Sequence, residues 1–211
     1  MKRRITDMRH PLTYRYFIGF VFLAVAASCA PTKTLHVWKD DQYNQRLKKV
    51  LIIAVTEQEY MRDHFENVLA ENLESRGIAA VASNKVFPQP GAKIDREAIV
   101  AKVKELGIGS VLVARPVSKK EVSQLTPGGL YFVPTNYYSS YYGFYNESFL
   151  AVPGATYDAE YFNIVTNVYD VRSEKLIWSY LSQVKVEGSK QGAINPFITI
   201  LVKQLEEGKL L

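Results

Sequence analysis

Hydrophobic positions in residues 49–77 fall into a short continuous run followed by a helically spaced stripe. Residues 50–55 are uninterrupted apolar positions rich in β-branched side chains, which is typical of a strand buried on both faces in a parallel sheet. Thr56 and Glu59 fit a capping box, and the apolar positions after them predict a helix that Gly77 ends.

The same alternation of strand and helix continues to residue 117. Residues 78–82 predict a second strand, Asp95 is placed to cap a second helix that Gly107 ends, and residues 110–117 predict a third strand. A β-α-β-α-β order of this kind implies parallel strands joined by right-handed crossovers.

The last part of the chain favours an antiparallel hairpin and a helix. Residues 161–169 and 175–186 both favour strand, and the second arm carries Trp178 and Tyr180. Asn195 as the cap and Pro196 at the first helical position then predict a helix that ends at Gly208. We therefore expect a single α/β domain over 49–211, with a parallel core, a hairpin and a C-terminal helix, in all about five strands and three helices.

Residues 119–158 break this pattern, because they lack helical spacing and are rich in tyrosine and glycine. Roughly 40 residues without regular structure is long for a compact domain, so we interpret the segment as an insertion. Tyrosine combines a large contact area with a hydroxyl group and suits recognition of partners. The segment 125–158 is a predicted contact surface, and the alternative is that its rings pack on the sheet or on one another. The candidate contact residues are Tyr131, Tyr137, Tyr138, Tyr141, Tyr142 and Tyr145.

The first 28 residues have the layout of an export signal. A basic stretch precedes an apolar run at 16–27, and small residues precede Cys29, the one cysteine of the chain. The apolar run is shorter than the roughly 20 residues of a membrane span. Residues 25–29 resemble a bacterial lipobox, which predicts acylation of Cys29 and a tether over 29–48. An ordinary cleaved signal and an uncleaved N-terminal anchor are the alternatives.

Charge and cysteine content narrow the function classes. The chain carries 26 basic and 21 acidic residues, and five of the basic and one of the acidic residues lie in 1–28, which leaves a net charge of +1 for the rest. This balance does not suggest a nucleic-acid partner, which needs a clustered basic face. Acylation of Cys29 leaves no thiol for a disulfide, a zinc site or a nucleophile.

Two histidines follow the export signal, His36 in the expected tether and His64 on the first predicted helix. Asp63 and Glu66 are too close to His64 in sequence to face it on a helix, so we expect no hydrolytic triad and no metal site. Nothing in the sequence indicates a cofactor or an enzyme.

Several runs resemble a group of small uncharacterised bacterial lipoproteins with a domain of unknown function. They are residues 36–40, 48–55, 62–66, 74–83, 166–170 and 175–179. The layout is more distantly similar to the α/β domains of curli-secretion and penicillin-binding-protein-activator lipoproteins. The resemblance implies a location in the cell envelope, and it implies no catalytic residue.

Together these features predict a non-catalytic binding or assembly module, anchored through Cys29 and in contact with an envelope protein or a glycan. Ala30 differs from the aspartate of an inner-membrane retention signal and favours the outer membrane. A receptor for a small ligand or a glycan is the alternative, with a pocket bordered by Tyr137, Tyr141 and Trp178. An enzyme, the third possibility, needs acids and His64 to converge in a cleft.

Overall fold

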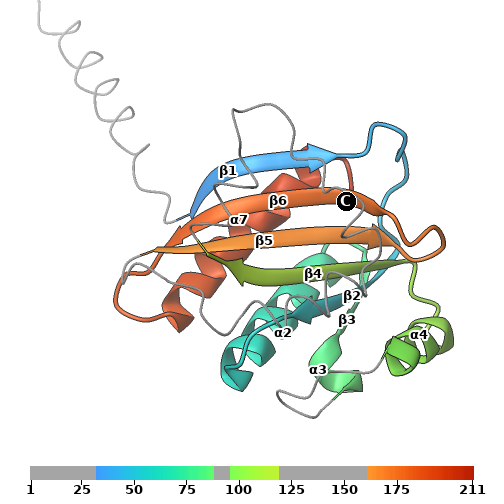
Figure 1. The fold of residues 1–211 in the computed structure, drawn as a ribbon, viewed down its shortest axis with the longest axis horizontal. Coiled ribbons are helices and arrows are strands. Elements are labelled where there is room, and N and C mark those ends of the chain that lie inside the picture. The colour runs from blue at the N-terminus through green and yellow to red at the C-terminus, as the bar shows by residue number, and fades with distance from the viewer. Residues whose placement is uncertain (1–31, 88–95, 119–160) are drawn as a thin grey trace, which may run out of the picture. The chain divides into compact units, whose positions relative to one another are not determined.

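Six strands form one mixed sheet in the order β1-β6-β5-β4-β2-β3 (Figure 1). The computed structural model describes residues 32–87, 96–118 and 161–211, and the elements below belong to those ranges. The strands are β1 (Thr32–Lys39), β2 (Lys49–Ala54), β3 (Ala79–Ala82), β4 (Ser110–Val117), β5 (Tyr161–Asp170) and β6 (Leu176–Lys185).

The predicted parallel core and hairpin are confirmed. Strand β2 pairs in parallel with β3 on one side and with β4 on the other, while β4, β5 and β6 follow one another in antiparallel pairs. The α/β fold class expected from the sequence is therefore correct, and all described elements belong to one unit, Pro31–Leu211.

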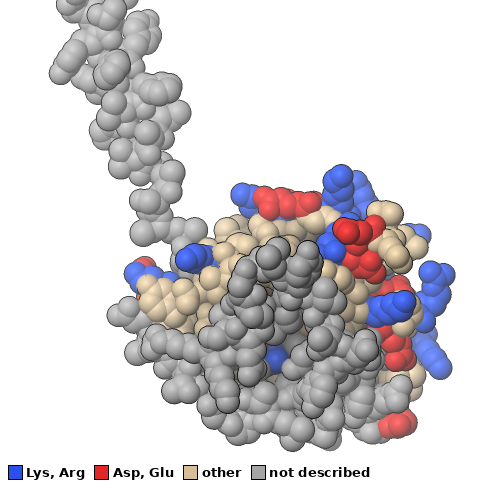
Figure 2. Space-filling view, turned by 45° about the horizontal axis from the view of Figure 1, so that its top comes forward, with Lys and Arg blue, Asp and Glu red and all other residues tan. Residues whose placement is uncertain are grey.

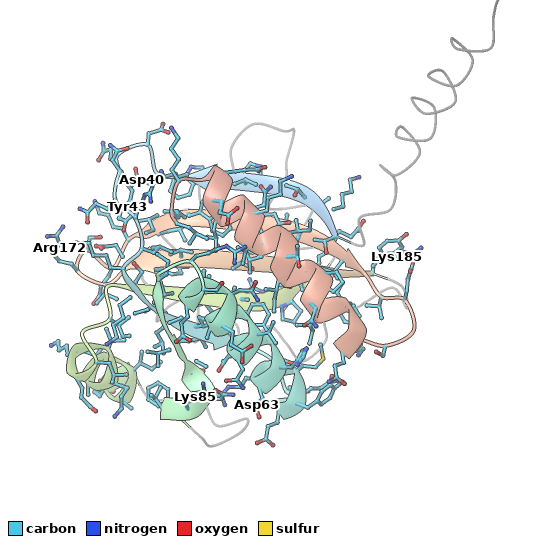
Figure 3. The ribbon with its side chains drawn as sticks, turned by 180° about the vertical axis from the view of Figure 1, so that it is seen from behind. Asp40, Tyr43, Asp63, Lys85, Arg172 and Lys185 are labelled. Carbon is cyan, nitrogen blue, oxygen red and sulfur yellow. The ribbon has the colours of Figure 1, made fainter. Side chains whose placement is uncertain are left out.

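Helices cover both faces of the sheet. Helices α2 (Glu59–Glu74) and α7 (Ile194–Glu207) lie on one face, which Figure 3 views from the front. Their apolar side chains, such as Leu69 and Leu201, pack on Ile52 and Leu112 of the sheet. Helix α4 (Arg96–Glu105) contributes Ile99 to the core on the other face. The short α3 (Ser83–Val86) follows β3, and a 3-10 turn, η4 (Gln191–Ala193), leads into α7.

The segment expected to be a tether contains a strand, so that prediction was wrong for residues 32–39. Strand β1 lies at the edge of the sheet and pairs antiparallel with β6, from Thr32 opposite Val184 to Lys39 opposite Trp178. Leu35 and Trp38 pack against the core, whereas the side chains between them are more polar or exposed. Leu35 and Trp38 are three residues apart, so burial along β1 does not alternate strictly, and the register with β6 shifts between Thr34 and His36. The folded unit consequently begins before residue 49.

Two predicted helix starts were also wrong. Helix α2 begins at Glu59, and Thr56 lies before it, where its hydroxyl accepts a hydrogen bond from the Gln58 amide at 3.2 Å. Helix α7 begins at Ile194, so Asn195 is inside the helix and its side chain contacts another helix. The predicted cap Asp95 lies outside the described residues.

Gly208 follows α7, where the sequence predicted the end of the helix. Its φ is −70°, and the positive φ of 56° belongs to Lys209. A Cβ on Gly208 would lie 3.2 Å from Nε1 of the fully buried Trp178. The close approach of an indole ring, rather than a left-handed backbone, is what favours glycine there.

Candidate binding cavity

A partly open cavity of about 230 Å³ lies at the end of the sheet where the parallel strands β2 and β4 terminate. Its floor is the sheet, and its walls are the first turns of α2 and α7. Most lining side chains are apolar. They include Ala54, Val55, Met61, Phe65, Ala114, Pro116, Phe162, Ile164, Val184, Val186, Ala193, Ile194 and Phe197.

The order of the strands explains why a cavity forms at this end. From β2 the chain passes through α2 to β3 on one side, and then returns through α4 to β4 on the other side of β2. Helices α2 and α4 cover opposite faces, so β2 and β4 form the point at which the direction of winding reverses. In open α/β sheets, ligands bind beyond the carboxyl ends of the strands at such a point.

Contacts between α2 and α7 hold the two walls together. The rings of Phe65 and Phe197 stack with centroids 5.8 Å apart and an interplanar angle of 19°. Next to these rings in sequence, His64 Nε2 lies 3.0 Å from Asn195 Oδ1. At the far ends of the helices, Arg76 Nε donates to Glu206 Oε1 at 2.7 Å. These pairs bridge the two helices close to both of their ends.

Three charged residues line the cavity: Glu57, Arg115 and Lys190. Side chains along β4 alternate between the two faces of the sheet. Arg115 therefore lies with Val113 and Val117, on the face opposite to α2 and α7. The exposed Lys190, just after β6, holds its Nζ 5.0 Å from the centroid of the Phe162 ring. Lys190 is therefore the cation on the α7 side of the cavity, and Glu57 is an exposed acid on the α2 side.

A buried ion pair fixes the α2 wall to the sheet. Glu66 is fully buried, and its carboxylate accepts hydrogen bonds from the Ala54 amide at 2.8 Å, the Ser83 hydroxyl at 2.7 Å and the Asn84 amide at 2.7 Å. Arg62 Nε lies 3.3 Å from the same carboxylate. Burial raises the pKa of Glu66, and these four donors act against that rise. The cluster joins α2 to the ends of β2 and β3, beside the cavity.

Most residues predicted to be functional lie outside the described part of the chain. These are Cys29 and the candidate contact tyrosines Tyr131, Tyr137, Tyr138, Tyr141, Tyr142 and Tyr145. The insertion joins the domain at Ser118 and Tyr161, next to the cavity-lining Pro116 and Phe162.

Trp178, His36 and His64, which the sequence singled out as candidates for binding or chemistry, do not line the cavity. Trp178, expected to border a pocket, is fully buried in the core and stacks on Tyr180. His36 lies in β1, where burial lowers its pKa. In the described ranges, no group of three or more His, Cys, Asp or Glu side chains is placed to hold a metal ion. None of the described helices is long and apolar enough to cross a membrane.

The cavity itself could not be recognised in the sequence. Its lining comes from separate segments between residues 54 and 197, and residues such as Ala54 and Phe197 have the pattern of ordinary core positions. The sequence predicted the β-α-β-α-β order of the elements, but only the structure shows that β4 returns to the other side of β2, which creates the winding reversal.

Charged side chains are mixed in sign on the face shown in Figure 2, where lysine and arginine alternate with aspartate and glutamate over the described surface. Fold and cavity together define a mixed α/β protein with an apolar cavity at the carboxyl ends of its parallel strands.

The sequence matches no protein-family model and no curated protein. Among solved structures, the chain is similar to PelC from Paraburkholderia phytofirmans, described as a dodecamer, with a TM-score of 0.44 and 10% identity over 82% of this chain and 96% of that chain. A variant of the same PelC gives a TM-score of 0.44 and 12% identity over 81% and 98% of the two chains. Similarity at this level carries no functional argument.

Proposed function

We propose that this chain is a lipid-anchored protein of the bacterial cell envelope that binds an apolar ligand without transforming it. Cys29 carries the anchor, and Ala30 favours the outer membrane. The apolar cavity between α2 and α7 is the observation that carries the binding part of the proposal. It combines a largely hydrophobic lining with a few polar groups, as ligand sites usually do.

The composition of the lining favours binding over catalysis. The described lining residues include Glu57 and Lys190 as exposed charged groups, and none of them is a histidine, cysteine or aspartate. Enzymes that use a carboxylate or an amine as a general acid or base usually bury it beside charged neighbours, whereas Glu57 and Lys190 are both exposed. The predicted tyrosine contact surface stays a separate hypothesis for a protein or glycan partner.

Two measurements test the proposal. The full chain and Cys29→Ser are expressed in bacteria fed labelled palmitate, and we expect label and membrane fractionation only with Cys29.

The mature chain carrying Cys29→Ser, exported through an ordinary cleavable signal, is then titrated with an environment-sensitive apolar dye. We expect saturable binding that Ala54→Leu removes, whereas an unlabelled Cys29 or a dye that does not bind contradicts the corresponding half of the proposal.

A further inference from the structure

We infer that the cavity takes one acyl chain of a membrane phospholipid, with the lipid phosphate beside Lys190. This inference rests on the proposed lipid anchor and on the proposed use of the cavity as a ligand site. It adds the chemical class of the ligand and the side from which the ligand enters.

The position of β1 limits how far the proposed anchor can be from the cavity end of the sheet. Only residues 30 and 31 separate Cys29 from Thr32, the first residue of β1. An extended chain spans at most about 3.3–3.6 Å per residue, so three residue steps allow at most roughly 11 Å between the acylated residue and the start of β1. Thr32 pairs with Val184 of β6, and Val184 lines the cavity.

The cavity end of the sheet is therefore the end nearest the bilayer. The expected tether would have allowed the domain to stand away from the membrane in any orientation. With residues 32–39 paired to β6, the start of β1 and the end of β6 are held near the lipid surface. Figure 3 shows Lys185 at this end of the sheet, and Asp40 and Tyr43 at the opposite end.

The lining fits a single hydrocarbon chain. The volume of about 230 Å³ exceeds the roughly 150 Å³ of an apolar protein cavity that binds benzene, so it has room for part of one acyl chain. Aromatic and aliphatic side chains such as Met61, Phe65 and Phe197 surround it from the two helices.

The charged residues of the lining fix the direction of the head group. Lys190 follows β6, the strand that pairs with β1, so it lies on the anchor side of the cavity. Glu57 belongs to the loop between β2 and α2, further from β1 in the strand order. An anionic phosphate at the anchor side meets Lys190, whereas a cationic head group would favour Glu57.

Head-group and chain-length preferences test the inference on the mature chain with Cys29→Ser. The probes are alkyl phosphates of increasing length, alkyl trimethylammonium ions and alkyl glucosides. We expect the affinity for alkyl phosphates to rise about fourfold per methylene until the cavity is full, as burial of a methylene group implies. We expect phosphate to be the preferred head group. Because Lys190 is exposed, Lys190→Gln should weaken phosphate binding only about two- to fivefold and leave glucoside binding unchanged.

Matched variants separate the cavity from general effects. Ala54→Leu fills the cavity, and Ala80→Leu makes the same change at a partly buried alanine of β3 that packs on the same core but does not line the cavity. Ala54→Leu should weaken every probe more than tenfold and Ala80→Leu should not. Lys175→Gln, at the other end of β6, controls for the loss of one positive charge.

The lipid source is tested with the full lipidated chain in phosphatidylethanolamine and phosphatidylglycerol vesicles that contain a phospholipid with a photoreactive acyl chain. We expect crosslinks to Met61 or Phe197, reduced in Ala54→Leu and retained in Ala80→Leu. Apolar probes that bind without a phosphate preference, or crosslinks that avoid the cavity, overturn this inference and leave the proposed function standing. Failure of every probe to bind a folded chain overturns this inference and the ligand-binding half of the proposed function.

Discussion

Glu66 of α2 and Ser83, the first residue after β3, share a 2.7 Å hydrogen bond inside the protein, and Arg62 Nη2 donates to the same Ser83 hydroxyl at 3.0 Å. Arg62 also donates to the Phe87 carbonyl at 3.1 Å. The carboxylate and the guanidinium therefore satisfy polar groups from three segments of the chain. Removal of the Glu66 carboxylate or of the Arg62 guanidinium leaves the other charge buried without its counterpart.

Glu66→Gln is expected to destabilise the fold by about 3–5 kcal/mol, the usual cost of breaking a buried ion pair. The glutamine side chain keeps the shape of glutamate but loses the negative charge opposite Arg62. Its amide nitrogen is a donor, so it cannot accept the hydrogen bond from a backbone N–H group that the carboxylate oxygen in its place accepts. Urea unfolding followed by circular dichroism measures the change. Arg62→Met should cost a similar amount, and the double variant should cost clearly less than the sum of the two. Additive losses would contradict a direct coupling between the two charges.

The stacked rings of Phe65 and Phe197 predict a second coupling. Both side chains are buried, so replacement of either by alanine should cost about 3–5 kcal/mol. The stacked geometry should add a coupling energy of about 0.5–1.5 kcal/mol in a double-mutant cycle. Thermal unfolding of the two single variants and the double variant measures this energy. A coupling near zero would show that the rings contribute only their separate burial.

Acid should weaken the native state through His36. Burial lowers the pKa of His36 below its usual value of about 6.5, so the native state binds fewer protons than the unfolded chain near that pH. The contribution of neutral His36 is therefore present above about pH 6.5 and is lost as the pH falls towards the lowered pKa. Urea midpoints measured between about pH 5 and 8 should fall less steeply in His36→Asn than in the wild type. Parallel pH profiles for the two proteins would exclude His36 as a source of this dependence.

Much of the sheet could be predicted because its strands carry local signals. The continuous apolar run that forms β2 is buried on both faces, and Val50, Leu51 and Ile52 are completely inaccessible. Gly77 and Gly107 have positive φ values of 81° and 61°, as the predicted helix ends require. These features depend on residues close together in sequence, which a pattern can show.

Features that depend on distant residues could not be predicted in the same way. Thr56 and Asn195 both have side chains that can cap a helix. The Thr56 hydroxyl instead accepts a hydrogen bond from the Gln58 amide before α2 begins, and the Asn195 side chain contacts His64 of α2. The cavity is a gap between side chains from four strands, two helices and their loops. No single segment carries a signal for such a gap, because each of its apolar residues is equally compatible with a filled core.

The edge strand β1 shows the same limit and leads to the last prediction. Its sequence is half polar, and its pairing partner β6 lies near the other end of the chain, so local pattern alone favoured a tether. Leu35 packs against the core, whereas Val37 is 38% exposed. Leu35→Asp should therefore destabilise the domain by about 1–3 kcal/mol, and Val37→Asp, the matched control two residues away, should have a much smaller effect. Denaturant unfolding of the mature chain compares them. Equal and negligible effects of both substitutions would indicate that residues 32–39 do not pair with β6 in solution, and the anchor would then be free to hold the cavity far from the membrane.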